Sequence, residues 1–165
     1  MNLTELMRED LIVTDLYGPS KESVLQALID HLVDVGALEN GEDVLRLLVD
    51  RENLMTTGVR TGFAIPHAFS DQAPHSLVAF GRIPEGVDWK ALDQKPVHFV
   101  FLLLGPPQAK GLHLRLLARV SRLLSSKVFV HRLEQARTPS QILRAIEASE
   151  LDLALCGDSE AQGAR

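Results

Sequence analysis

The chain has 165 residues, of which 45% are hydrophobic and 24% are charged. This length and composition are typical of one globular domain and exclude wholesale disorder. With 17 basic and 22 acidic residues the formal net charge is −5, so we expect no nucleic-acid partner.

Cysteine content and hydropathy exclude further classes of protein. Cys156 is the single cysteine, so an internal disulfide and a thiolate zinc centre are excluded. The N-terminal segment lacks the basic and apolar regions of a secretory signal. The longest apolar run, residues 99–104, is too short to cross a bilayer. We therefore expect a soluble, cytoplasmic protein with no membrane insertion.

The first third of the chain predicts two helices followed by a loop. Ser20 fits an N-cap, and apolar residues follow it at helical spacing as far as Gly36. A second helix is expected from Asn40 to about Asn53. Residues 56–67 contain two glycines and a proline, a composition that favours a loop and a short strand.

The remainder of the chain predicts strands and then helices. We expect strands over residues 77–82 and 97–104, the second buried and ended by a Gly-Pro-Pro sequence. Helical periodicity follows over residues 112–124 and 127–136, and Thr138 precedes Pro139 as the cap of a last helix.

This order of elements predicts an α/β fold, a single-domain sandwich with a mixed β-sheet flanked by helices. We expect the domain to cover residues 1–150. Residues 151–165 lack turn signals and periodicity and end in small polar residues, which predicts a weakly ordered C-terminal tail.

Charge is unevenly distributed along the chain. Residues 1–58 carry 12 acidic and 4 basic residues, a net charge of −8, whereas residues 110–144 carry 8 basic residues and Glu134, a net charge of +7. Solvated helix faces are the simplest interpretation of such blocks. A docking surface in the basic C-terminal third stays open as an alternative.

Among six histidines, His67 has the most distinctive local sequence. Pro66 fixes its own φ and holds Ile65 extended, which helps to aim the next side chain. A stiff backbone before a nucleophile favours the geometry of attack. Gly58 and Gly62 permit close backbone approach and leave N–H groups free to face an anion. Both a functional histidine and a plain turn histidine fit these facts.

Two further residues are candidates for the same site. His113 lies in the first turn of a predicted helix, where unpaired N–H groups and the helix dipole favour a phosphate. Arg51 ends the helix before the His67 loop and has the geometry to donate two parallel hydrogen bonds to a phosphoryl group. The alternatives are a core histidine and an exposed helix-end arginine. We interpret the other histidines as structural or surface residues, namely His31, His75, His98 and His131.

The run from Arg51 to His67 resembles the signature of EIIA domains of the phosphoenolpyruvate-dependent sugar phosphotransferase system. The resemblance is to the fructose/mannitol group, which includes the nitrogen-regulatory EIIA proteins. The pattern is an Arg-Glu pair, Thr-Gly, a second glycine and then apolar-Ala-apolar-Pro-His. A His-Leu pair at His113 opening a Leu- and Ala-rich helix, and the segment 93–97, also look like the family. Ala68 departs from the pattern, because a glycine commonly follows the histidine, and so does the Gly-Leu pair before His113.

What the resemblance implies is a phosphohistidine carrier. It covers about residues 3–148 and implies that His67 is the phosphorylated nucleophile, Arg51 the phosphoryl clamp and His113 a supporting histidine. It also implies that Thr57, Gly58 and Gly62 bind the substrate. We expect an apolar rim around His67, formed by Ile65 and by Phe63 or Phe69. No cofactor or metal is implied.

The implied partner is an HPr-type phosphocarrier protein that donates the phosphoryl group. Because no EIIB, EIIC or HPr segment is seen beside the domain, the nitrogen-regulatory type is expected, acting through phosphorylation-dependent binding of other proteins. The close alternative is the EIIA component of a sugar permease that passes phosphate to an EIIB.

Two hypotheses from other classes stay open. One is a metal-dependent hydrolase that uses His67, His113 and a carboxylate such as Asp71. The other is an interaction module in which His67 is inert.

Overall fold

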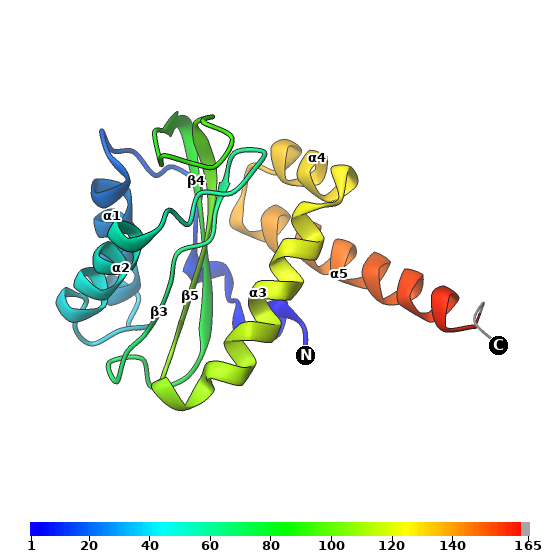
Figure 1. Ribbon diagram of the computed structural model, residues 1–165, viewed down its shortest axis with the longest axis horizontal. Helices are drawn as coiled ribbons and strands as arrows, with labels where there is room; N and C mark the ends of the chain where they lie inside the picture. The colour runs from blue at the N-terminus through cyan, green and yellow to red at the C-terminus, as the bar shows by residue number, and fades with distance from the viewer. Residues whose placement is uncertain (163–165) are drawn as a thin grey trace.

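A mixed β-sheet with helices on both faces forms the body of the molecule (Figure 1). The computed structural model describes the backbone of residues 1–162 and the side chains of residues 1–157. The sheet order is β1-β4-β5-β2, with β3 also paired to β5. The predicted α/β sandwich is confirmed. Within the described residues, no helix is both long and apolar enough to span a membrane.

The central strand is β5 (Val97–Gly105), which is buried except for the half-buried His98. It runs antiparallel to β4 (Leu77–Val87) and parallel to the short strands β2 (Phe63–Ala64) and β3 (His67–Phe69). The strand β1 (Ile12–Val13) pairs with β4 in parallel. The structure extends the predicted strand 77–82 to Val87, with a register irregularity between Arg82 and Val87 that accommodates Pro84 and Gly86.

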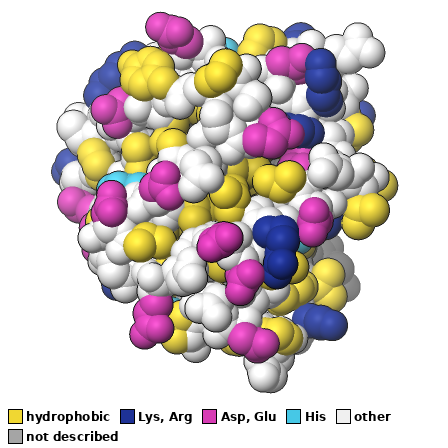
Figure 2. Space-filling model, turned by 90° about the vertical axis from the view of Figure 1, so that its left-hand side faces the viewer, with side chains coloured by type: hydrophobic (Ala, Val, Ile, Leu, Met, Phe, Trp, Pro, Cys, Tyr) yellow, Lys and Arg dark blue, Asp and Glu magenta, His cyan; other side chains and the backbone are white. Residues whose placement is uncertain are grey.

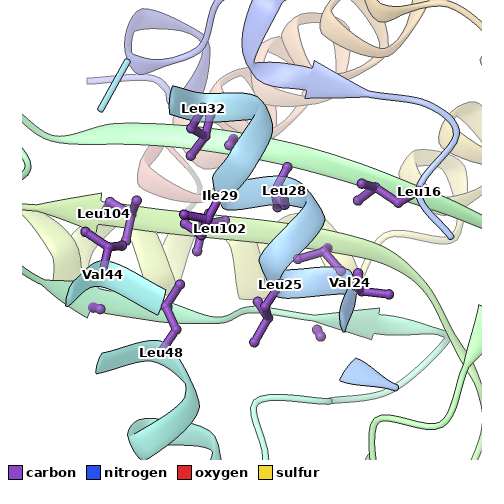
Figure 3. Packing of buried hydrophobic residues seen from close by; sticks show 14 of the residues in the cluster. Leu16, Val24, Leu25, Leu28, Ile29, Leu32, Val44, Leu48, Leu102 and Leu104 are labelled. Atoms are coloured by element: carbon purple, nitrogen blue, oxygen red, sulfur yellow. The ribbon is translucent and has the colours of Figure 1, made fainter. Parts of the chain in front are cut away.

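One face of the sheet is covered by α1 (Lys21–Asp34) and α2 (Glu42–Leu54). Ser20 caps α1 as predicted, because its side chain accepts a hydrogen bond from the Ser23 amide. The cap position of α2 is occupied by Gly41. Asn40, one residue earlier, accepts a hydrogen bond from the Glu42 amide through its side chain at 2.9 Å. Figure 3 shows the apolar stripes of both helices meeting the side chains of Leu102 and Leu104 on β5.

The opposite face is covered by α3 (Lys110–Leu124), α4 (Lys127–Gln135) and α5 (Pro139–Gln162). Short 3₁₀ turns lie at Leu3–Leu6, Glu9–Leu11 and Pro107–Ala109. The core on this side is rich in aromatic rings from the sheet, which pack against leucine, valine and isoleucine of the helices. The rings are those of Phe63, Phe80, Phe99 and Phe101.

The last helix differs from the sequence prediction. Instead of ending near Glu150, α5 runs to Gln162 and extends beyond the rest of the fold (Figure 1). Residues 151–156 contain no glycine or proline, Leu153 packs against the aromatic core, and Asp152 pairs with Arg132 at 2.7 Å. The predicted tail is therefore helical as far as Gln162, and residues 163–165 lie outside the described residues. The domain boundary at residue 150 stays a prediction.

The charge asymmetry of the sequence becomes a separation across the sheet. The acidic segment 1–58 includes α1 and α2, and acidic side chains spread over that face of the molecule (Figure 2). The basic segment 110–144 includes α3, α4 and the start of α5 on the other face. The acidic helices α1 and α2 and the basic helices α3 and α4 therefore lie on opposite sides of one sheet.

Candidate functional site

The backbone around His67 is fixed by strand pairing. His67 begins β3 opposite Leu103 of β5, and the Leu103 amide donates to the Pro66 carbonyl at 3.0 Å. The half-buried His67 ring has Nδ1 at 2.9 Å from the Ile65 carbonyl oxygen. In a neutral ring this contact requires the proton on Nδ1, because a carbonyl only accepts. Nε2 then carries the lone pair and is the nucleophilic atom.

His113 lies at the carboxyl end of β5, beside the end of β3. Its ring centroid is 4.8 Å from that of Phe69, and the residue is only 1% exposed. Gly105 makes room for the ring, since a Cβ at this position would lie 2.3 Å from His113 Nε2. Ser76 Oγ lies 3.4 Å from the same nitrogen. The buried-histidine interpretation is therefore correct, and burial places the ring next to the strand that begins with His67.

The environment of His113 favours its neutral form. Burial lowers its pKa below the usual 6.5, the neighbouring His67 lowers it further, and the Leu104 backbone opposes both effects. Nδ1 of His113 is buried and has no hydrogen-bond partner within the described residues. A buried polar atom without a partner is uncommon in native proteins and requires an explanation.

Arg51 lies in the last turn of α2, the helix that packs against β3. One guanidinium nitrogen, Nη1, donates to the Met55 carbonyl at 3.1 Å, which satisfies the end of its own helix. A guanidinium has five N–H donors, so this bond leaves others for a ligand. Arg51 thus has the helix-end role considered for it and keeps the capacity to act as a clamp.

Thr57 belongs to a buried polar network that sequence reasoning missed. Its amide and hydroxyl both donate to the Glu52 carboxylate, which also accepts from Trp89 Nε1 at 3.2 Å and Lys21 Nζ at 3.1 Å. The carbonyl of Thr57 accepts from the Ile65 amide. Its polar groups are therefore engaged in holding the turn between α2 and β2. The sequence signal that could have revealed this network was the position of Glu52, four residues after Leu48 on the buried stripe of α2.

The two glycines serve packing and pairing instead of facing His67. A Cβ on Gly58 would lie 2.9 Å from Ala91 Cα, so this glycine permits a close backbone contact. Gly62 has φ +82° and its carbonyl accepts from the amides of His98 and Phe99. His98 and Leu103, the partner of His67, are separated by about 16 Å of extended strand. The structure therefore does not bring Gly62 to His67.

Of the two phenylalanines considered for the apolar rim, one lies at the site and the other lies in the core. Phe63 is fully buried and stacked on Phe99, with ring centroids 4.9 Å apart. Phe69 is the aromatic residue that lies at the site, against His113. As for the metal hypothesis, residues 1–157 contain no group of three or more His, Cys, Asp or Glu side chains placed to hold a metal ion.

Comparison with known proteins gives a consistent match. Residues 5–149 match the family described as phosphoenolpyruvate-dependent sugar phosphotransferase system, EIIA 2. The fructose-specific EIIA component of Haloferax volcanii is 35% identical over 133 residues, covering 81% of this chain and 86% of that protein. The nitrogen regulatory protein of Bradyrhizobium diazoefficiens is 34% identical over 142 residues, with 86% and 92% covered.

Larger relatives and solved structures agree with this match. The fructose-specific EIIABC component of Bacillus subtilis is 32% identical over 88% of this chain, which spans only 23% of that protein. The crystal structure of nitrogen regulatory protein IIA-Ntr from Neisseria meningitidis has a TM-score of 0.79 at 30% identity, covering 87% of this chain and 97% of that one.

Proposed function

We propose that this chain, which belongs to the EIIA 2 family of the phosphoenolpyruvate-dependent sugar phosphotransferase system, carries a phosphoryl group on Nε2 of His67. The family is one of phosphotransferase components, and the residue and atom are our assignment. The observation that carries it is the contact between His67 Nδ1 and the Ile65 carbonyl. This contact leaves Nε2 as the nitrogen with a free lone pair.

The transfer needs no chemistry beyond nucleophilic displacement. Nε2 of His67 attacks phosphorus while the bond from phosphorus to the donor's ring nitrogen breaks, so the donor nitrogen keeps the electron pair of that bond. The His67 ring becomes cationic, and its Nδ1 keeps its proton and donates a hydrogen bond to the Ile65 carbonyl, which stabilises the positive charge. Catalysis of such a transfer is mainly positioning and charge stabilisation.

His113 and Arg51 supply complementary stabilisation of the phosphoryl oxygens. A neutral His113 has one ring N–H, and it donates a hydrogen bond without repelling the cationic phosphorylated His67. The unpartnered Nδ1 of His113 is the atom available for that bond. Arg51 adds a fixed positive charge and planar donors.

The carrier is proposed to act with an HPr-type donor. As acceptor we favour the nitrogen-regulatory type, in which the phosphorylation state of His67 alters binding to other proteins. The likeness to nitrogen regulatory protein IIA-Ntr, at TM-score 0.79, supports it. The 35% identity to a fructose-specific EIIA component supports the alternative, transfer to an EIIB domain.

Phosphorylation can be tested by incubation with phosphoenolpyruvate, enzyme I and HPr, followed by intact-mass measurement. We expect the wild-type chain to gain one acid-labile phosphoryl group and His67→Ala to gain none. His75→Ala is the matched control, because His75 is exposed in a loop, and it should be phosphorylated normally. An unmodified wild-type chain, or a phosphorylated His67→Ala chain, would contradict the proposal.

The choice between regulation and transport needs a separate experiment. Pull-downs with His67→Ala and with His67→Glu, which adds negative charge at the same position, should recover different sets of proteins if phosphorylation controls binding. Recovery of an EIIB protein alone would defeat the regulatory interpretation and leave the permease role.

A further inference from the structure

A cavity of about 580 Å³ lies at the end of α3 that is remote from His113. It is enclosed by the loop before β2, by Ile65, and by the facing ends of α3 and α4, and Figure 1 shows that loop passing beside α4. From His113 to Ser125, which lines the cavity, α3 rises about 18 Å. The volume lies within the roughly 300–1,000 Å³ range of small-molecule sites. The cavity is therefore remote from His113, includes neither histidine of the proposed phosphorylation site in its lining, and is large enough for a ligand.

The walls of this cavity are mainly apolar. Val59 and Ile65 line it from the loop side, and Leu124 and Val130 line it from the helices. Leu92, at its edge, is 69% exposed. A hydrocarbon body placed here would cover side chains that now face water, which is favourable.

The border of the cavity carries positive charge from two sides. Arg60 comes from the loop and Lys127 from the start of α4, and within residues 1–157 neither forms a salt bridge. Glu134 is the acidic residue of the lining, and the seven residues from Lys127 place it about 10 Å further along α4. Two cations that form no salt bridge within residues 1–157, in the lining of a mainly apolar cavity, favour an anionic group there.

We propose that this cavity is a binding site for a small amphipathic carboxylate. The apolar body of the ligand lies against Ile65, Leu124 and Val130, and its carboxylate lies between Arg60 and Lys127. This site stands on its own observations and does not depend on the phosphorylation of His67.

Ile65 connects the cavity to His67. Its side chain lines the cavity, and its carbonyl accepts the hydrogen bond from His67 Nδ1 at 2.9 Å. A ligand that displaces the Ile65 side chain therefore alters the group that holds the His67 ring. If His67 is the phosphorylated residue, as proposed above, occupancy of the cavity changes the reactivity of Nε2.

Binding can be measured by NMR titration with octanoate, using octan-1-ol as a probe of the same chain length without charge. We expect saturable octanoate shifts at the methyl groups of Ile65, Leu124 and Val130, and about tenfold weaker binding of octanol. Replacing both cations, as Arg60→Gln with Lys127→Gln, should weaken octanoate to the level of octanol. The absence of saturable shifts, or equal binding of the two probes, would overturn the proposal.

A matched pair of variants on α4 locates the site. Val130→Trp fills the cavity and should abolish octanoate binding, whereas Val128→Trp, at a residue that is 57% exposed and outside the lining, should bind normally. Unchanged octanoate binding by Val130→Trp would place the ligand elsewhere and overturn the assignment.

The connection between the cavity and His67 is measured by the ¹⁵N chemical shifts of the His67 imidazole in the unphosphorylated chain. Octanoate should change these shifts in Val128→Trp and leave them unchanged in Val130→Trp. Methyl shifts without a change at His67 would overturn the connection through Ile65, and neither result depends on the phosphorylation assay.

Discussion

At the scale of single residues, the buried ring of His113 contributes to the response of the fold to acid. Burial and the nearby His67 lower its pKa below 6.5 in the folded chain. As the pH falls below 6.5, His113 is therefore protonated in the unfolded chain before it is protonated in the folded chain. The unfolded state then binds more protons than the native state, and stability falls as the pH is lowered. Above about pH 6.5 both states are neutral at this residue, and it contributes no pH dependence.

Replacing His113 should remove that acid sensitivity. In urea unfolding from pH 7.5 down to pH 4.5, we expect the wild-type unfolding free energy to fall more steeply than that of His113→Gln, by up to about 1.4 kcal/mol per pH unit for one proton. His75→Gln, at an exposed histidine, should keep the wild-type slope. Parallel curves for wild type and His113→Gln would show that the ring is not held neutral.

Arg51 should matter for phosphorylation through both its charge and its planar shape. Arg51→Lys keeps the charge but loses the paired donors, and Arg51→Met loses both. For the initial rate of transfer from phosphorylated HPr, we expect a decrease of about tenfold in Arg51→Lys and about 100-fold in Arg51→Met, as for the removal of one stabilising donor. Circular dichroism should show that both variants are folded. A wild-type rate in Arg51→Met would leave Arg51 only its bond to the Met55 carbonyl.

The residue scale also shows where sequence reasoning ends. The roles proposed for His67, His113 and Arg51 come from a family resemblance that is carried by local sequence patterns. The partners of Gly58 and Gly62 are Ala91 and His98, more than 30 positions away in the chain. A glycine in a loop indicates that another part of the chain can come close to its backbone, but the local sequence does not identify which part.

At the scale of elements, periodicity predicted the helices well and their ends less well. The apolar stripes of α1 to α4 are regular, and the predicted cap at Ser20 is a local feature. By contrast, β4 passes Pro84 and Gly86 because β5 continues to pair beyond them. The extension of α5 depends on Leu153 and on the pair between Asp152 and Arg132. These boundaries are set by tertiary contacts, which override local propensity.

Two glycines in different elements should respond oppositely to a methyl group. Gly58→Ala pushes a Cβ to 2.9 Å from the Ala91 backbone, and we expect a loss of about 1–3 kcal/mol, typical of overpacking. Gly111→Ala, in the first turn of α3 with nothing within 4 Å, should gain about 0.5 kcal/mol through helix propensity. Urea unfolding of both variants measures the difference. Equal stability would mean that the turn around Gly58 can relax.

At the scale of the whole molecule, a buried carboxylate joins the N-terminal turn to α3 and α5. Glu150 on α5 is 2% exposed and accepts hydrogen bonds from the Leu3 amide at 2.7 Å and from the Thr4 hydroxyl at 3.2 Å. Arg119 Nε on α3 donates to the same carboxylate at 2.6 Å, and its Nη2 donates to the side chain of Asn2 at 2.7 Å. The N-terminus, α3 and α5 are therefore held by one charge pair.

Removing the cation of this pair should destabilise the fold as a unit. Arg119→Met leaves a buried carboxylate without its counter-charge, which typically costs about 3 kcal/mol. Arg122→Met on the same helix is the control, because the exposed Arg122 side chain lacks a hydrogen bond or ion pair within the described residues, and it should lose less than about 0.5 kcal/mol. Urea midpoints compare the two variants, and hydrogen exchange should show faster exchange of the Leu3 amide in Arg119→Met. If both variants unfold at the same midpoint, the backbone and hydroxyl donors of Leu3 and Thr4 are sufficient to hold the Glu150 charge.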